Sequence, residues 1–107
     1  METKVVRIYV TPADIARNKG IEPLGIPGKS RCMTCPVATA INRRLRPGYD
    51  AVVNGDEYRV QGYAYPAGGT GHVRLPDRVK LAIRRLDDNQ PVPRFNFRIA
   101  LPVEVLR

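Results

Sequence analysis

Alternation of apolar and polar residues marks two segments near the ends of this chain of 107 residues. Segment 94–101 (RFNFRIAL) places aromatic or aliphatic residues at every second position, and segment 4–10 (KVVRIYV) shows a similar period. Successive side chains of a strand point to opposite faces, so this period predicts two half-buried β-strands, of which 94–101 is the clearer. Since each strand needs a partner strand and a cover for its apolar face, the pattern excludes a purely helical fold.

Three segments between these strands have the spacing and the boundary residues of helices. The first begins after Thr11, because Thr is a good N-cap, Pro12 suits the first helical position and Asp14 favours the positive end of the helix. It is expected to stop near Gly20. Apolar residues at helical spacing predict a second helix from Pro36 to about Arg46 and a third over about 77–87.

Turn-forming residues divide the rest of the chain into short extended pieces. Segments 50–54 and 57–65 predict two strands around a hairpin turn at Gly55 and Asp56, and a short apolar segment follows at 73–75. The resulting order of elements predicts an α+β fold: a small, mostly antiparallel sheet with about three helices packed on one side. Residues 1–107 are expected to form a single compact basic domain, because the length and the hydrophobic content of 43% suit one modest core.

Positive charge is concentrated in one part of the chain. The formal net charge is +8, and residues 23–49 contain no acid. The five basic residues of that span are Lys29, Arg31, Arg43, Arg44 and Arg46. This distribution favours an anionic partner, although a solvated basic surface that aids solubility would give the same count.

Hydropathy and the N-terminal residues indicate the cellular compartment to expect. The chain holds no apolar run of the length that a membrane span needs, and the residues after Met1 lead into a strand pattern rather than an apolar signal region. We therefore expect a cytoplasmic protein with no membrane partner.

The segment PLGIPGKSRCMTCPVATAI (23–41) combines features of three chemistries. A phosphate loop requires Gly five positions before its Gly-Lys-Ser, where this chain has Pro23, so that motif fails. Cys32 and Cys35 supply half of a zinc site, and the chain has only one histidine, so we predict no metal and no cofactor. Dithiol redox chemistry, a metal site shared between two chains and simple burial of a small cysteine stay open as alternatives.

An anion site at the start of the second helix fits this segment best. The amides that follow Pro36, including those of Val37 and Ala38, lack intrahelical partners, and the helix dipole places positive charge there. Four polar or basic residues lie just before the helix: Lys29, Ser30, Arg31 and Thr34. The alternative is an ordinary N-cap by Thr34 or Cys35, with the basic side chains in solvent.

Three segments resemble a group of small uncharacterised proteins found in phages and prophages. They are IYVTPADIARNKG, CMTCPVATAINRRL and PVPRFNFRIALP, with a Val-Thr helix start, a Cys-Pro-Val-Ala helix and a Pro-Phe-x-Phe strand. The resemblance carries no catalytic residues. It implies a setting in which small basic proteins act on host machinery, on the phage genome or on nucleotide signals of host immunity. For a phage-encoded chain, the expected compartment would be the host cytoplasm.

The first functional hypothesis is non-enzymatic binding of a small phosphorylated, nucleotide-type ligand, with counter-defence by sequestering a nucleotide immune signal as its biological form. In addition to the residues around Pro36, the expected contacts come from a basic helix face and from the 63–72 region. These further residues are Arg43, Tyr63, Tyr65, Gly69, Thr70 and His72. Tyr63 or Tyr65 would stack on a base, while the Gly-rich loop and His72 would close over the phosphate.

Two other classes stay open. A basic nucleic-acid-binding regulatory protein would use Arg43, Arg44 and Arg46 on phosphates, although no helix-turn-helix or zinc-finger spacing is present. An inhibitor that binds a host enzyme has no particular marker in the sequence. Catalysis is the least favoured class because the single histidine has no partner motif. The sequence leaves a homo-oligomer open.

Overall fold

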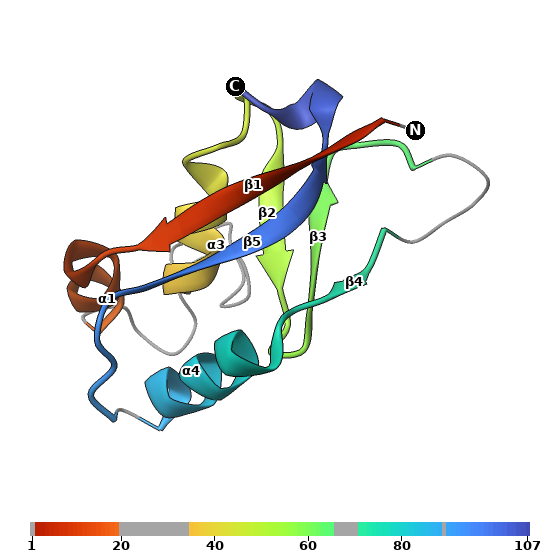
Figure 1. The fold of residues 1–107 in the computed structure, drawn as a ribbon. Coiled ribbons are helices and arrows are strands. Elements are labelled where there is room, and N and C mark those ends of the chain that lie inside the picture. Colours follow the sequence, from red (N-terminus) through yellow and green to blue (C-terminus); the bar gives the residue numbers. More distant parts are fainter. Residues whose placement is uncertain (1, 20–34, 66–70, 89) are drawn as a thin grey trace.

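The computed structural model describes residues 2–19, 35–65, 71–88 and 90–107 (Figure 1). The chain forms β1 (Thr3–Val10), α1 (Pro12–Lys19), α3 (Pro36–Asn42), β2 (Asp50–Val53), β3 (Glu57–Gln61), β4 (Val73–Arg74), α4 (Asp77–Asp87) and β5 (Phe95–Pro102). A short 3₁₀ helix, Val103–Val105, follows β5. The α+β class predicted from the sequence is confirmed.

Strands β1 and β5 form a two-stranded antiparallel ribbon. Pairing runs from Thr3 opposite Pro102 to Val10 opposite Phe95, so both strands are paired along their whole length. The inward face carries Val6 and Ile8, opposite Ile99 and Phe97. All four are buried, as the alternating pattern predicted.

The second sheet has the strand order β2-β3-β4, and its neighbours are antiparallel. The predicted turn lies between β2 and β3, and Gly55 takes φ +91° there, a conformation that favours glycine. The inward face of this sheet is formed by Ala51, Val53, Tyr58 and Val60.

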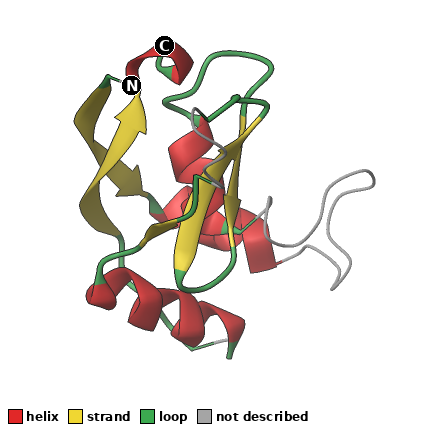
Figure 2. Ribbon diagram, turned by 90° about the vertical axis from the view of Figure 1, so that its right-hand side faces the viewer, coloured by secondary structure: helices red, strands yellow, loops and turns green. Residues whose placement is uncertain are grey.

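The described strands form two sheets where the sequence led us to expect one. Helix α3 packs against β1 of one sheet and β2 of the other. Helix α1 packs against α3, and α4 lies across the end of the molecule at which β4 arrives (Figures 1 and 2). Residue alternation identifies a strand but not its partner, so the sequence alone did not reveal the division.

Helix α3 ends at Asn42, four residues before the predicted end. After Asn42 the chain tightens into a turn, in which the Leu45 amide donates to the Asn42 carbonyl oxygen at 3.0 Å. The next residues pair with the C-terminal segment: Leu45 forms a β-bridge with Leu106, and the Arg46 amide donates to the Val105 carbonyl oxygen. Leu45 is buried, but as part of a bridge rather than of a helix.

One cluster of buried side chains connects the two sheets and the helices. Its largest fully buried members are Phe97, Ile8, Ile41, Leu45 and Leu101. In addition, the Tyr58 hydroxyl donates to the Ala100 carbonyl oxygen at 2.8 Å, which ties β3 to β5. The two sheets are therefore joined by side chains rather than by a shared ladder of backbone hydrogen bonds.

Candidate functional site

Six of the predicted ligand-binding residues lie outside the described part of the chain. They are Lys29, Ser30, Arg31, Thr34, Gly69 and Thr70. Cys32 also lies there. The predicted basic loop before α3 and the Gly-rich loop after β3 therefore stay predictions.

The start of α3 is closed by a cap. Cys35 is the N-cap residue, and its Sγ accepts a hydrogen bond from the Ala38 amide at 3.4 Å. The Thr39 amide donates to the Cys35 carbonyl oxygen at 2.9 Å. The side chains of Val37 and Ala38 are fully buried in the core. The Cys35 cap that the sequence left open as the alternative is the arrangement present, and the Ala38 amide is already occupied.

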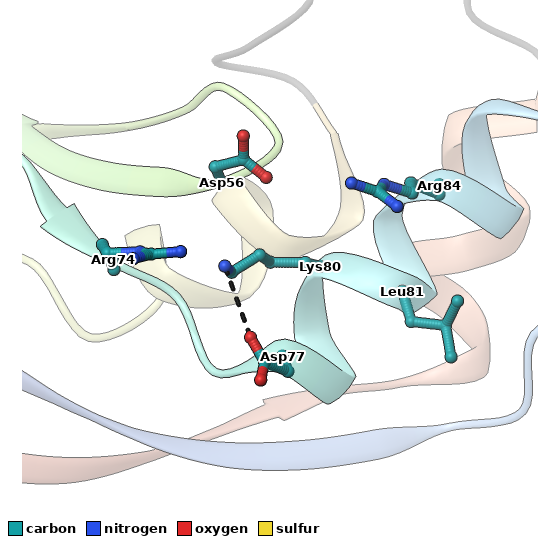
Figure 3. A pocket seen from close by; sticks show the side chains of 6 residues that line it. All are labelled: Asp56, Arg74, Asp77, Lys80, Leu81 and Arg84. Atoms are coloured by element: carbon teal, nitrogen blue, oxygen red, sulfur yellow. Dashed lines mark ion pairs between the residues drawn. The ribbon is translucent and has the colours of Figure 1, made fainter.

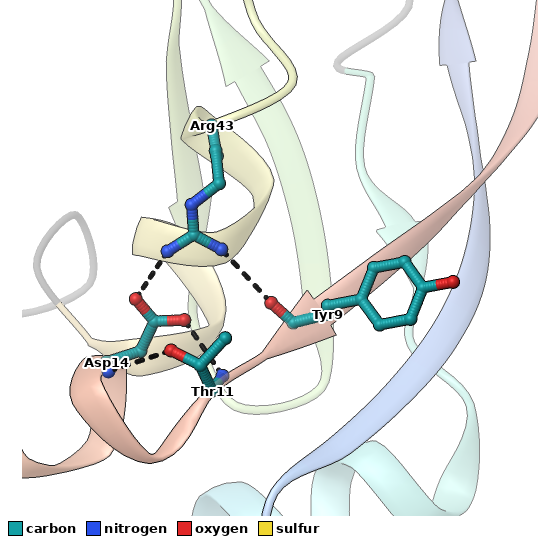
Figure 4. Close-up of polar contacts among 4 residues, drawn as sticks. All are labelled: Tyr9, Thr11, Asp14 and Arg43. Carbon is teal, nitrogen blue, oxygen red and sulfur yellow. Dashed lines mark hydrogen bonds and ion pairs between the residues drawn. The ribbon is translucent and has the colours of Figure 1, made fainter.

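Arg43 forms a structural ion pair instead of a free basic surface (Figure 4). One guanidinium nitrogen contacts the Asp14 carboxylate at 2.5 Å, and the other donates to the Tyr9 carbonyl oxygen at 3.2 Å. Asp14 and Thr11 also form a reciprocal cap: the Thr11 amide donates to the carboxylate, and the Asp14 amide donates to the Thr11 hydroxyl oxygen. Burial acts to raise the pKa of Asp14, but these hydrogen bonds and the Arg43 charge outweigh it and lower the pKa below its ordinary value.

The two other arginines of this segment also contact the backbone. Arg44 donates to the Arg7 carbonyl oxygen at 3.4 Å, and Arg46 Nε donates to the Leu106 carbonyl oxygen at 2.7 Å. These bonds hold 43–46 against β1 and the C-terminal segment. The charge concentration seen in the sequence therefore serves, in part, to join elements.

Tyr63, Tyr65 and His72 lie on the connection between β3 and β4. The two tyrosine rings make an edge-to-face contact, with centroids 4.8 Å apart. The Tyr65 hydroxyl oxygen accepts a hydrogen bond from the Val60 amide, and its ring packs on Gly71 so closely that a Cβ there would collide with it. His72 Nδ1 lies 3.0 Å from a carboxylate oxygen of Glu57.

This region lies on the opposite side of the molecule from α1, which Arg43 contacts (Figure 1). Thus the structure brings Tyr63 and Tyr65 together, places Tyr65 against Gly71 next to His72, and leaves Arg43 apart from them. The tyrosines are engaged in packing, since Tyr63 lies against the core and desolvation, followed by the nearby Glu104 carboxylate, raises its pKa.

A pocket that the sequence did not predict lies between β4 and α4 (Figure 3). Its volume is about 410 Å³. We call it the β4–α4 pocket, and its lining residues are Asp56, Arg74, Asp77, Lys80, Leu81 and Arg84. The Leu75 amide donates to the Asp56 carbonyl oxygen at 2.8 Å, which fixes the β2–β3 turn against the end of β4 and so shapes one wall.

Three cationic side chains in this pocket point into the same hollow (Figure 3). Lys80 is 13% exposed, and its ammonium group lies 3.3 Å from the Asp77 carboxylate. Arg74 and Arg84 make no ion pair or hydrogen bond through their side chains with any residue that the structure describes. Spacing on α4 places Lys80 and Arg84 on one face, but nothing in the sequence indicates that β4 delivers Arg74 opposite them.

Within the described ranges, no three His, Cys, Asp or Glu side chains come together as metal ligands. No helix in those ranges is long and apolar enough to cross a membrane.

No family model, no curated protein and no solved structure matches this chain. The functional assignment therefore rests on the geometry of the molecule.

Proposed function

We propose that the chain binds a small phosphorylated, nucleotide-type ligand in the β4–α4 pocket. The observation that carries this proposal is the convergence of Arg74, Lys80 and Arg84 from two elements, with both guanidinium groups unpaired among the described residues. The ligand class is the one expected from the sequence, and the site is different.

Phosphate is the group that best matches these three cations. Arginine presents planar pairs of N–H donors that suit two phosphate oxygens at once, and lysine adds a compact positive charge. Lys80 is preorganised because most of its side chain is buried and Asp77 holds its ammonium group. Ordering of such a side chain before binding lowers the entropic cost of association.

The remaining lining residues favour a nucleotide over a free polyanion. Asp56 and Asp77 would repel additional phosphates, but their carboxylates can accept hydrogen bonds from ribose hydroxyls or base amino groups. Leu81 is 50% exposed and offers an apolar surface for a base. A volume of about 410 Å³ falls in the usual range for small-ligand pockets.

Binding without catalysis is part of the proposal. Among the described residues, the pocket lining has no serine, threonine, cysteine or histidine, and its lysine, Lys80, lies against the Asp77 carboxylate, which favours binding over catalysis. In the phage setting that the resemblance implies, we propose sequestration of a nucleotide signal as the outcome of this binding.

The test is isothermal titration calorimetry with adenosine diphosphate, pyrophosphate and adenosine. We expect one saturable site for adenosine diphosphate, weaker binding of pyrophosphate and no measurable binding of adenosine. Arg74→Ala and Arg84→Ala should each remove a charge-assisted contact of about 1.5 to 3 kcal/mol and weaken binding about tenfold or more. Arg85→Ala, on the same helix but outside the pocket, is the matched control.

Arg31→Ala separates the pocket from the loop site predicted by the sequence. If adenosine diphosphate bound with unchanged affinity to Arg74→Ala and Arg84→Ala, the β4–α4 pocket would be excluded. A loss confined to Arg31→Ala would place the ligand before α3.

A further inference from the structure

The outward face of the β1–β5 ribbon is polar and cationic. Arg7 and Arg98 occupy directly opposite positions on it. The Arg7 guanidinium donates to the Asn96 side-chain oxygen at 2.6 Å, which orients both side chains across the ribbon. Tyr9 is 57% exposed beside them. The ribbon crosses the front of the molecule in Figure 1 and forms one side of it in Figure 2.

No acidic residue interrupts this charge. Residues 3–13 and 90–103 contain no Asp or Glu, whereas the outward positions of the strands and their immediate flank carry Arg7, Arg94 and Arg98. Like charges directly opposite each other destabilise an antiparallel pair, so the Arg7–Arg98 juxtaposition does not serve folding. A polyanion lying along the face would convert this repulsion into attraction.

A groove extends the face at one end of the ribbon. It has a volume of about 530 Å³ and is lined in part by Tyr9, Arg94, Phe95 and Asn96. An aromatic ring, a guanidinium group and a carboxamide thus lie next to one another, where they can contact a sugar-phosphate backbone and base edges.

The edge of β1 is less suited to a partner than the face is. Arg43 and Arg44 donate to the Tyr9 and Arg7 carbonyl oxygens, so part of the backbone along this edge is already bonded. Addition of a partner strand at β1 would have to displace these arginines.

We infer that the outward face of the β1–β5 ribbon is a docking surface for duplex DNA and enters its major groove. Eight paired residues give a ribbon about 26 Å long, and two adjacent strands are about 5 Å apart, which the roughly 12 Å wide major groove accepts. Arg7, Arg98 and Asn96 face the base edges, where arginine and asparagine are the side chains that bond guanine and adenine. Arg94, at one end of the ribbon, contacts the flanking phosphates.

Fluorescence anisotropy with a labelled 20-base-pair DNA duplex of mixed sequence tests this surface at two or more salt concentrations. With the three cations Arg7, Arg94 and Arg98 facing the groove or the phosphates, log Kd should rise with log salt with a slope of about 2 to 3. Arg98→Ala and Arg7→Ala should each weaken binding about tenfold at low salt and reduce the slope by up to about 1. Both variants should keep an unfolding midpoint close to the wild type's, as is usual for substitutions of surface residues.

Arg74→Ala is the matched control, because it removes one exposed arginine from the β4–α4 pocket and should leave DNA affinity within about twofold. Conversely, Arg98→Ala should bind adenosine diphosphate like the wild type, so the failure of either proposal is distinguishable from that of the other. The inference is overturned if the duplex does not bind, if Arg7→Ala and Arg98→Ala bind it like the wild type, or if double-stranded RNA, whose major groove is too narrow for the ribbon, binds equally well.

Discussion

At the scale of single residues, Asp14 is a buried carboxylate that serves two elements. It caps α1 through Thr11 and pairs with Arg43, which follows α3. Its pKa is lowered in the folded chain because the hydrogen bonds and the guanidinium favour the ionised form more than burial disfavours it. Its contribution to stability is thus present above the ordinary Asp pKa and is lost as pH falls through the lowered value.

Asp14→Ala should reduce the free energy of unfolding by about 2 to 3 kcal/mol at pH 7, since it removes the cap and leaves Arg43 without its carboxylate. Urea denaturation followed by circular dichroism measures this. The loss should shrink in acid below about pH 4, where the wild type begins to lose the same contribution. Asp77→Ala, which removes a fully exposed carboxylate, should cost less than about 1 kcal/mol. Equal effects of the two substitutions would contradict the structural role of Asp14.

At the scale of elements, the two faces of the β1–β5 ribbon differ in role: one packs in the core, and the other is the proposed recognition surface. Its inward side chains belong to the core, and its outward side chains carry the charge proposed to meet DNA. The turn that follows α3 covers part of one edge of the ribbon through Arg43 and Arg44. The polar face is therefore not required for folding, and substitutions on the two faces should have separable effects.

Val5 and Val6 are a matched pair of residues with which to test the difference between the two faces of the ribbon. They are neighbours in β1, but Val5 is 63% exposed and Val6 is 4% exposed. Val6→Ala should cost about 2 kcal/mol through lost burial and a small cavity, whereas Val5→Ala should cost less than about 1 kcal/mol. Urea midpoints of the two variants give the difference. Similar losses would mean that the ribbon is not packed on one face as described.

At the scale of the whole molecule, two small sheets share one core. Neither sheet alone has enough buried surface to be stable, because two- and three-stranded sheets need packing against other elements. The Tyr58–Ala100 hydrogen bond crosses between them, and burial raises the pKa of Tyr58 to about 12. Because Tyr58 stays protonated to higher pH when folded, stability should fall as pH rises from 10 toward 12.

Tyr58→Phe should lower the free energy of unfolding by about 1 to 2 kcal/mol at neutral pH, since it leaves the Ala100 carbonyl oxygen unbonded. It should also weaken the loss of stability between pH 10 and 12. Thermal melts at neutral and alkaline pH measure both effects. Tyr9→Phe alters an exposed ring and serves as the control. If stability depended on pH in the same way in Tyr58→Phe and the wild type, the proposed link between the Tyr58 hydroxyl and stability at alkaline pH would be contradicted.

The sequence by itself determined the local features of this protein. Alternation predicted the β1 and β5 strands, Thr11 and Asp14 predicted the start of α1, and apolar spacing predicted α4 over the residues observed. Each of these depends on residues close together in the chain, because hydrogen bonds within a turn and the period of side chains are local quantities.

Only the tertiary structure decided which segments meet. It divided the strands into two sheets, ended α3 at Asn42 by pairing the next residues with the C-terminal segment, and paired Arg43 with Asp14. It also brought Arg74 to Lys80 and Arg84, and Arg7 to Arg98. These contacts join residues far apart in the chain or on different elements, and their partners are selected by the packing of one shared core rather than by any spacing that the sequence displays.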